Sequence, residues 1–243
     1  MENFYEFDAN HFDLDLLLDY QNKKIIESTN YCTIMQACDD CMRYSRMYGI
    51  VAEPGYGKSS TFEHFILNNK NNVHYISLKR AMSNKDFYNK ILERSGWSNV
   101  YKTSRLYDII ESIGYHLAQL PGKHLLIIDE AGKLSHNQRL CLHDLRDAVK
   151  SNTGVILAGP NYFHAELLDQ RSKQLQGIPE LFRRIDMFIT LDPPSNNEKR
   201  ELFRQNGFKN QLLINSASKS CEHLGDVYRT VENFAILAKR RKS

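Results

Sequence analysis

The sequence predicts an α/β fold in which helices flank a parallel five-stranded sheet, followed by a small helical domain. Short apolar runs rich in β-branched residues alternate with segments of helical periodicity, a pattern typical of a parallel sheet. The alternation ends after Leu191 at the sequence DPPSNN, because two prolines continue neither a central strand nor a helix. From Glu198 onward the periodicity is helical only.

The expected elements follow this alternation along the chain. Strands are expected at Met47–Ala52, Val73–Leu78, His124–Asp129, Gly154–Ala158 and Ile185–Leu191. Helices are expected near 58–69, 84–95, 103–118, 136–150 and 161–176, with starts at Ser83 and Ser135. The expected domains are an N-terminal helical extension (1–46), the α/β domain (47–193) and a C-terminal helical domain with a basic tail (194–243), with a hinge near 192–197.

Composition and charge exclude several classes of protein. With 243 residues, 42% hydrophobic and 25% charged, the chain is typical of a globular protein, and its net charge of +3 permits nucleic-acid binding without requiring it. No apolar run approaches the roughly 20 residues that span a bilayer, and the acidic N-terminus lacks the features of a secretory signal. The odd count of five cysteines indicates a reducing compartment, so we expect a cytoplasmic protein without a membrane partner.

The CxxC pair of Cys38 and Cys41 is the one pattern that suggests a zinc site. No second CxxC or histidine pair follows it, and 32–42 has helical apolar spacing. We therefore expect buried thiols on a helix.

Residues 51–60, VAEPGYGKSS, resemble a phosphate-binding loop placed between a buried strand and a helix. Gly55 and Gly57 let the main chain turn its N–H groups toward phosphate oxygens. Lys58 is expected to reach the β- and γ-phosphates, and the Ser59 hydroxyl is expected to ligate Mg²⁺. The expected nucleotide-binding residues of the loop are Pro54, Gly55, Tyr56, Gly57, Lys58, Ser59 and Ser60.

Ala52 stands where such loops usually begin with glycine. It ends the strand before the loop wraps the phosphates, so a methyl group is tolerated there provided that φ is negative. The alternative, a glycine-rich turn without a ligand, is less well supported.

A second motif, which is acidic, follows the phosphate-binding loop after about 70 residues. The apolar run LLII leads into Asp129 and Glu130. Asp129 is expected to hold Mg²⁺ through water, and Glu130 to polarise the attacking water as a base. The alternative is a pair of solvated carboxylates at a strand end.

With these two motifs the chain resembles an AAA+ ATPase, a P-loop NTPase with a helical lid, which implies ATP and Mg²⁺ as cofactors and ATP hydrolysis. GVILAGPN is similar to the sensor-1 strand, with Asn161 as the polar residue, although Pro160 intervenes after the glycine. IPELFRRIDMFITLDPP resembles the segment with the arginine finger, which implies Arg184 first and Arg183 second. GDVYRTVENF resembles sensor 2 and implies Arg229, although Tyr228 holds the usual arginine position.

Within AAA+ proteins the chain resembles the transposition helper ATPases of the phage Mu transposition protein B type. The resemblance rests on MYGIVAEPGYGKSSTF, HLLIIDEAGKLSHNQRLCLHDLRDAVKSNTGVILAGP and ELFRRI, and spans 47–240. It implies a bacterial, phage or mobile-element protein that oligomerises as a ring or helical filament on double-stranded DNA, without sequence specificity, and recruits or activates a transposase. About 46 residues precede the first strand, fewer than in the founding member.

Loops that face DNA in such helpers are expected to carry Lys79, Arg80, Lys102 and Arg105 here. Each could equally be a solvated charge, as could the tail KRRK, while Trp97 is expected to pack in the core. Two other functions remain open. One is a nucleotide-gated adaptor of the helicase-loader type, and the other is a signalling NTPase that does not bind DNA.

Overall fold

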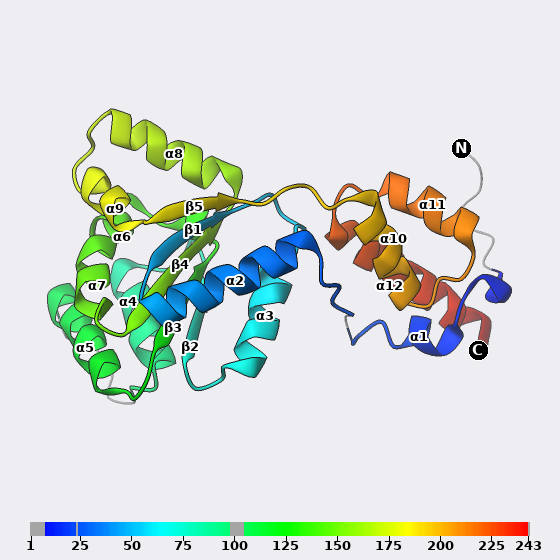
Figure 1. Ribbon diagram of the computed structural model, residues 1–243, viewed down its shortest axis with the longest axis horizontal. Coiled ribbons are helices and arrows are strands. Elements are labelled where there is room, and N and C mark those ends of the chain that lie inside the picture. Colours follow the sequence, from blue (N-terminus) through cyan, green and yellow to red (C-terminus); the bar gives the residue numbers. More distant parts are fainter. Residues whose placement is uncertain (1–7, 23, 98–104, 243) are drawn as a thin grey trace. The chain divides into compact units, whose positions relative to one another are not determined.

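The computed structural model describes residues 8–22, 24–97 and 105–242 (Figure 1). They divide into two compact units. The α/β unit comprises Thr33–Glu53 and Thr61–Leu191. The helical unit comprises Met1–Cys32, Pro54–Ser60 and Asp192–Ser243.

The α/β unit is built on a five-stranded, fully parallel sheet with the order β2-β3-β4-β1-β5. Strand β1 is paired on both sides, with Met47 opposite Val155 of β4 and Tyr48 opposite Met187 of β5. The central strands β3 and β4 are buried throughout, as their apolar sequences predict. The strands are β1 (Met47–Val51), β2 (Val73–Ser77), β3 (His124–Asp129), β4 (Thr153–Gly159) and β5 (Met187–Thr190).

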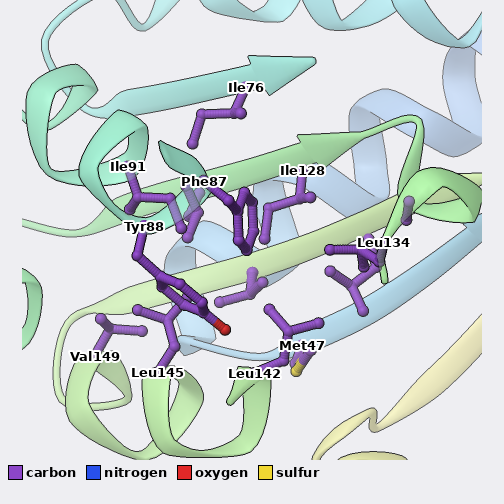
Figure 2. Packing of buried hydrophobic residues seen from close by; sticks show 14 of the residues in the cluster. Met47, Ile76, Phe87, Tyr88, Ile91, Ile128, Leu134, Leu142, Leu145 and Val149 are labelled. Atoms are coloured by element: carbon purple, nitrogen blue, oxygen red, sulfur yellow. The ribbon is translucent and has the colours of Figure 1, made fainter. Parts of the chain in front are cut away.

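Helices cover both faces of this sheet (Figure 1). On one face, α2 approaches so closely that a side chain on Gly154 of β4 would collide with the Cys41 carbonyl. On the other face, Phe87 and Tyr88 of α4 pack among strand residues and α7 (Figure 2). The helices are α2 (Thr29–Tyr44), α3 (Lys58–Asn68), α4 (Asn84–Arg94), α5 (Leu106–Gln119), η2 (Ala131–Lys133), α6 (His136–Leu140), α7 (Leu142–Val149), α8 (Asn161–Ser172) and α9 (Ile178–Arg184).

The helical unit has a separate core. Residues near the N-terminus contribute to it, since Phe12, Leu17 and Ile26 are buried against the C-terminal helices. The Tyr228 hydroxyl donates a hydrogen bond of 2.5 Å to the Lys24 carbonyl and anchors this segment. The elements are η1 (Ala9–His11), α1 (Leu14–Leu18), α10 (Asn196–Gln205), α11 (Gln211–Ser220) and α12 (Leu224–Lys242).

The fold predicted from the sequence is confirmed, with local differences. The helix expected near 136–150 is broken at Cys141, because the Tyr88 hydroxyl occupies the Gln138 carbonyl (3.0 Å) that would otherwise accept the next helical hydrogen bond. The helix expected near 161–176 ends at Ser172, and α9 was not predicted. Helix α10 starts at Asn196, inside the expected hinge. Strand β5 covers only the middle of the expected strand.

Other expectations concern the cysteines, Trp97 and the membrane. Cys38 and Cys41 are buried free thiols on α2, as expected, and burial raises the pKa of both. The described residues contain no cluster of metal-ligating side chains. Trp97 packs against the core of the α/β unit, with its ring edge-on to His116. In the part of the chain that the structure describes, every helix is too short or too polar to cross a bilayer.

Two buried histidines lie at the amino-terminal ends of β2 and β3. The rings of His74 and His124 stack with centroids 5.4 Å apart, and each ring contacts a main-chain carbonyl, Arg94 O at 3.1 Å and Pro121 O at 3.2 Å respectively. Burial lowers the pKa of His74 to about 4 and also lowers the pKa of His124. Burial therefore favours the neutral form of each ring in the folded chain.

The histidine pair predicts a loss of stability in mild acid. Unfolded His74 binds a proton below its ordinary pKa of 6.5, whereas folded His74 binds one only near pH 4. The free energy of unfolding should therefore fall by up to about 3 kcal/mol as the pH drops through this window. Urea unfolding from pH 7 to pH 4.5 measures the slope. His74→Phe should lose most of this pH dependence of the unfolding free energy and keep a smaller part that comes from His124. Equal slopes in the wild type and in His74→Phe would contradict the prediction.

Candidate functional site

The loop predicted to bind phosphate continues directly from the doubly paired strand β1. Ala52 is fully buried, and its N–H donates to the Gly159 carbonyl of β4 at 3.1 Å. Ala52 does not have a positive φ. The alanine thus extends the strand by one residue, a position where a methyl group replaces glycine without strain.

The loop itself has the geometry of an anion cradle. Gly55 and Gly57 have φ values of 87° and 89°, which side-chain-bearing residues rarely adopt. Alternation of such residues turns consecutive N–H groups inward, and α3 begins at Lys58 with its amino terminus directly after the loop. The Ser60 hydroxyl donates to the Gly57 carbonyl at 3.0 Å and closes the turn. The residues present therefore fit a phosphate group.

Asp129 ends β3 and is held from two sides. Its side chain is buried, with the residue only 2% exposed. The Tyr75 hydroxyl of β2 donates to Oδ2 at 2.8 Å, and the Glu130 N–H donates to Oδ1 at 2.8 Å. Burial, followed by the nearby Asp129 charge, raises the pKa of Tyr75, so the phenol stays protonated as a donor. A fixed carboxylate of this kind fits a divalent cation that prefers oxygen ligands, as does the Ser59 hydroxyl.

Glu130 follows in a strained conformation and is ion-paired. Its φ of 62° lies in the left-handed region, which costs a non-glycine residue about 1 kcal/mol. Its carboxylate lies 3.1 Å from the Lys133 ammonium, and the two side chains are 46% and 34% exposed. A pair this exposed is weak and can exchange. Glu130 is thus placed at the carboxyl edge of the sheet but engaged within its own turn.

The two candidate finger arginines differ in their surroundings. Arg184 donates to Asp147 of α7 at 2.7 Å, and this bond lowers the pKa of the Asp147 carboxyl. Arg183 is exposed, and no described residue forms an ion pair with it. Both precede β5 at the amino-terminal edge of the sheet, where Asp186 N bonds the Met47 carbonyl at the start of β1. They lie at the edge opposite the carboxyl ends of β1 and β3.

The two candidate sensor residues are exposed. Asn161 is the first residue of α8, with Pro160 as its N-cap in an extended conformation. Pro160 therefore starts the helix and leaves Asn161 at the carboxyl end of β4. The Arg229 side chain on α12 is 76% exposed and lies 3.6 Å from Asp226, while the neighbouring Tyr228 bonds to Lys24.

The candidate DNA-binding residues are scattered. Lys79 and Arg80 are exposed in the turn after β2, at the carboxyl edge of the sheet. Arg105 is exposed and forms an ion pair with Asp108 at 3.1 Å. Lys102 lies outside the described residues.

The comparison with known proteins agrees with the fold described above. A family model described as an AAA domain matches residues 42–167. The chain belongs to the AAA domain family. Its five-stranded parallel sheet with flanking helices is the AAA+ P-loop NTPase fold, a fold that holds nucleotides. No curated protein sequence matches this AAA protein.

Solved structures share the fold at low sequence identity. The Aeropyrum pernix ORC1 protein in complex with DNA is 10% identical with a TM-score of 0.71, covering 98% of this chain and 67% of that one. The Aeropyrum pernix ORC2 protein in ADPNP–ADP complexes is 15% identical with a TM-score of 0.62, covering 90% and 65%. Domain III of the Thermotoga maritima replication initiation protein DnaA is 12% identical with a TM-score of 0.55, covering 96% and 92%.

Several residues of this AAA domain that touch the candidate site residues were not predicted. Tyr75 contacts Asp129, Lys133 contacts Glu130 and Asp147 contacts Arg184. Only Lys133 has a sequence signal, because it lies three residues after Glu130. The other two contacts depend on which strands and helices are neighbours.

The Arg184–Asp147 pair predicts a measurable energetic coupling in the AAA domain. Arg184→Ala, Asp147→Ala and the double variant, compared by urea unfolding, should give a coupling of about 0.5–1 kcal/mol, since the pair is short but partly exposed. Arg183→Ala with Asp147→Ala forms the matched control and should show additive effects. Coupling of Asp147 to Arg183 instead of Arg184 would refute the assignment.

Proposed function

We propose that this chain is an ATPase that assembles on double-stranded DNA and recruits or stimulates a transposase. The observation that carries the proposal is the loop of Gly55 and Gly57, which leads from β1 into α3, together with Asp129 and Glu130 at the end of β3 on the same sheet edge. Lys58 and the loop N–H groups hold the phosphates, and Ser59 and Asp129 hold Mg²⁺. Bound Mg²⁺ would neutralise charge that develops on the phosphates.

Within this proposal, Glu130 orients and polarises the attacking water, which requires its carboxylate to leave Lys133. Asn161, at the end of β4, contributes a polar contact at the same sheet edge. The arginine finger belongs to the opposite edge of the sheet, so it acts on the nucleotide of a neighbouring copy. Hydrolysis then depends on assembly as a ring or filament.

Binding to DNA is supported by three features. The sequence resembles transposition helpers over 47–240. Exposed Lys79 and Arg80 lie on one turn, and the ORC1 structure with the shared fold contains DNA. Lysine and arginine contacts to phosphates hold the duplex without reading its sequence.

A nucleotide-gated adaptor is the second candidate, favoured by the ion pairs that occupy Glu130 and Arg184. Such a protein binds ATP, hydrolyses it slowly and holds a partner protein. One measurement distinguishes the two functions. The ATPase rate per chain is followed as the protein concentration rises, once with and once without duplex DNA. A rising, DNA-stimulated rate supports the transposition helper. A flat, slow rate together with tight ATP binding supports the adaptor.

Two substitutions separate binding from hydrolysis. Lys58→Ala should abolish ATP binding because the loop loses its phosphate-facing cation. Glu130→Gln should keep ATP binding while the hydrolysis rate falls by at least about 100-fold, since the amide cannot act as a base. Calorimetry with ATP and a phosphate-release assay measure the two quantities, with Lys70→Ala as the control. Full hydrolysis by Glu130→Gln would remove Glu130 from the proposed chemistry.

Charge reversal tests the proposed DNA surface. Lys79→Glu and Arg80→Glu should each weaken duplex binding several-fold and reduce the salt dependence of the affinity, because each removes one phosphate contact. Lys70→Glu is the matched control, since exposed Lys70 lies at the opposite sheet edge, before β2. Fluorescence anisotropy at 50–200 mM salt, a range over which such contacts weaken, measures both effects. Equal losses in Lys79→Glu and Lys70→Glu would show that only net charge matters.

A further inference from the structure

Within the helical unit, the start of α12 touches the phosphate loop. The Leu224 N–H donates to the Gly55 carbonyl at 3.1 Å. A side chain on Gly55 would come within 2.7 Å of His223 Cβ, so the loop and α12 approach at the limit of contact. The His223 ring lies 5.5 Å from the ring of buried Tyr56. His223 is thus a side chain of this helix start that packs on the loop, together with Leu224.

His223 also carries an unsatisfied polar atom. Its Nδ1 is buried and has no hydrogen-bond partner among the described residues, and its Nε2 is 3.9 Å from Glu222, too far for a hydrogen bond. Buried ring nitrogens normally have a partner. The Nδ1 nitrogen of His223 lacks a partner among the described residues and lies on a side chain beside the phosphate loop, which favours a ligand that supplies a hydrogen-bond acceptor.

Arg229, the sensor-2 residue implied by the family resemblance, lies in a different environment. Asp226 accepts hydrogen bonds from the main-chain N–H groups of Glu222 and His223, at 3.1 and 3.0 Å, and so caps α12. Arg229 lies 3.6 Å from this same carboxylate, and its side chain is mostly exposed to solvent. Arg229 therefore interacts with Asp226, the residue that caps α12.

We propose that His223, which directly precedes α12, contacts the nucleotide bound by loop 54–60, and that Arg229 does not. Its Nδ1–H donates a hydrogen bond to a phosphate oxygen. The proposal rests on the proposed nucleotide site. Because Gly55 bonds to Leu224, the same contact transmits the state of the loop to α12.

The test compares ATP affinities, measured by calorimetry with Mg²⁺ on the full chain. His223→Ala should weaken ATP binding about tenfold, the loss of one hydrogen bond to a charged group. His223→Asn should restore most of the affinity, because its amide nitrogen lies near the position of Nδ1, whereas His223→Gln, which places its amide near Nε2, should not. Arg229→Ala should stay within about twofold of the wild-type affinity.

The outcomes separate this proposal from the one on which it rests. If the wild type binds ATP no better than Lys58→Ala, the nucleotide site itself is wrong. If the wild type binds ATP and His223→Ala binds equally well, or Arg229→Ala causes the larger loss, the role of His223 is overturned. Equal unfolding temperatures of His223→Ala and the wild type without nucleotide show that the variant is folded. If His223→Ala unfolds at a lower temperature, the ATP affinities of His223→Asn and His223→Gln decide instead: higher affinity in His223→Asn supports the proposal, and equal affinities overturn it.

Discussion

The pairing of β1 on both sides is the constraint on which the site depends. Because β4 and β5 hold β1 in parallel register, the chain leaves the sheet at a fixed point, and Ala52 adds one more bond to Gly159 before the loop begins. The same register brings the ends of β1, β3 and β4 to one edge, where Asp129 and Asn161 follow. It also places the start of β5, and with it Arg183 and Arg184, at the other edge. The candidate arginines and the phosphate loop are therefore separated by the full length of the parallel strands, which is why the proposed function assigns them to two different copies.

The charged residues of the site differ in how firmly they are held. Asp129 is buried and hydrogen-bonded from Tyr75 and from the main chain, so its carboxylate is fixed. Glu130 and Arg184 are held by partly exposed ion pairs, which are weak and exchangeable. Under the proposed function, a fixed carboxylate at Asp129 combined with exchangeable ion pairs at Glu130 and Arg184 suits hydrolysis that starts only when a second copy or DNA changes the balance of these pairs.

The sheet and the loop could be predicted from the sequence because their signals are local. A buried strand, a glycine-rich turn and a helix lie in one stretch, and Asp129 with Glu130 directly follows an apolar run. What the sequence missed depends on distant partners. Tyr75 and Asp129 are 54 residues apart along the chain, and the break at Cys141 depends on a hydroxyl from α4. Phe12 and Leu17 were not expected in the core of the C-terminal helices, because their packing partners lie near the other end of the chain.

The departure at Tyr228 has a physical reason within the helical unit. An arginine at this position would have to bury its charge, because the side chain packs against the core and reaches the Lys24 carbonyl. A tyrosine fills the same space with an apolar ring and one donor, and it anchors the N-terminal segment. Under the proposed function, another residue near the start of α12 therefore makes the contact to the nucleotide. The first residue of α12 is bonded to Gly55, and the imidazole of the preceding His223 has a ring nitrogen without a partner among the described residues. With the role proposed for His223, anchoring of the N-terminal segment and contact to the nucleotide are divided between Tyr228 and His223.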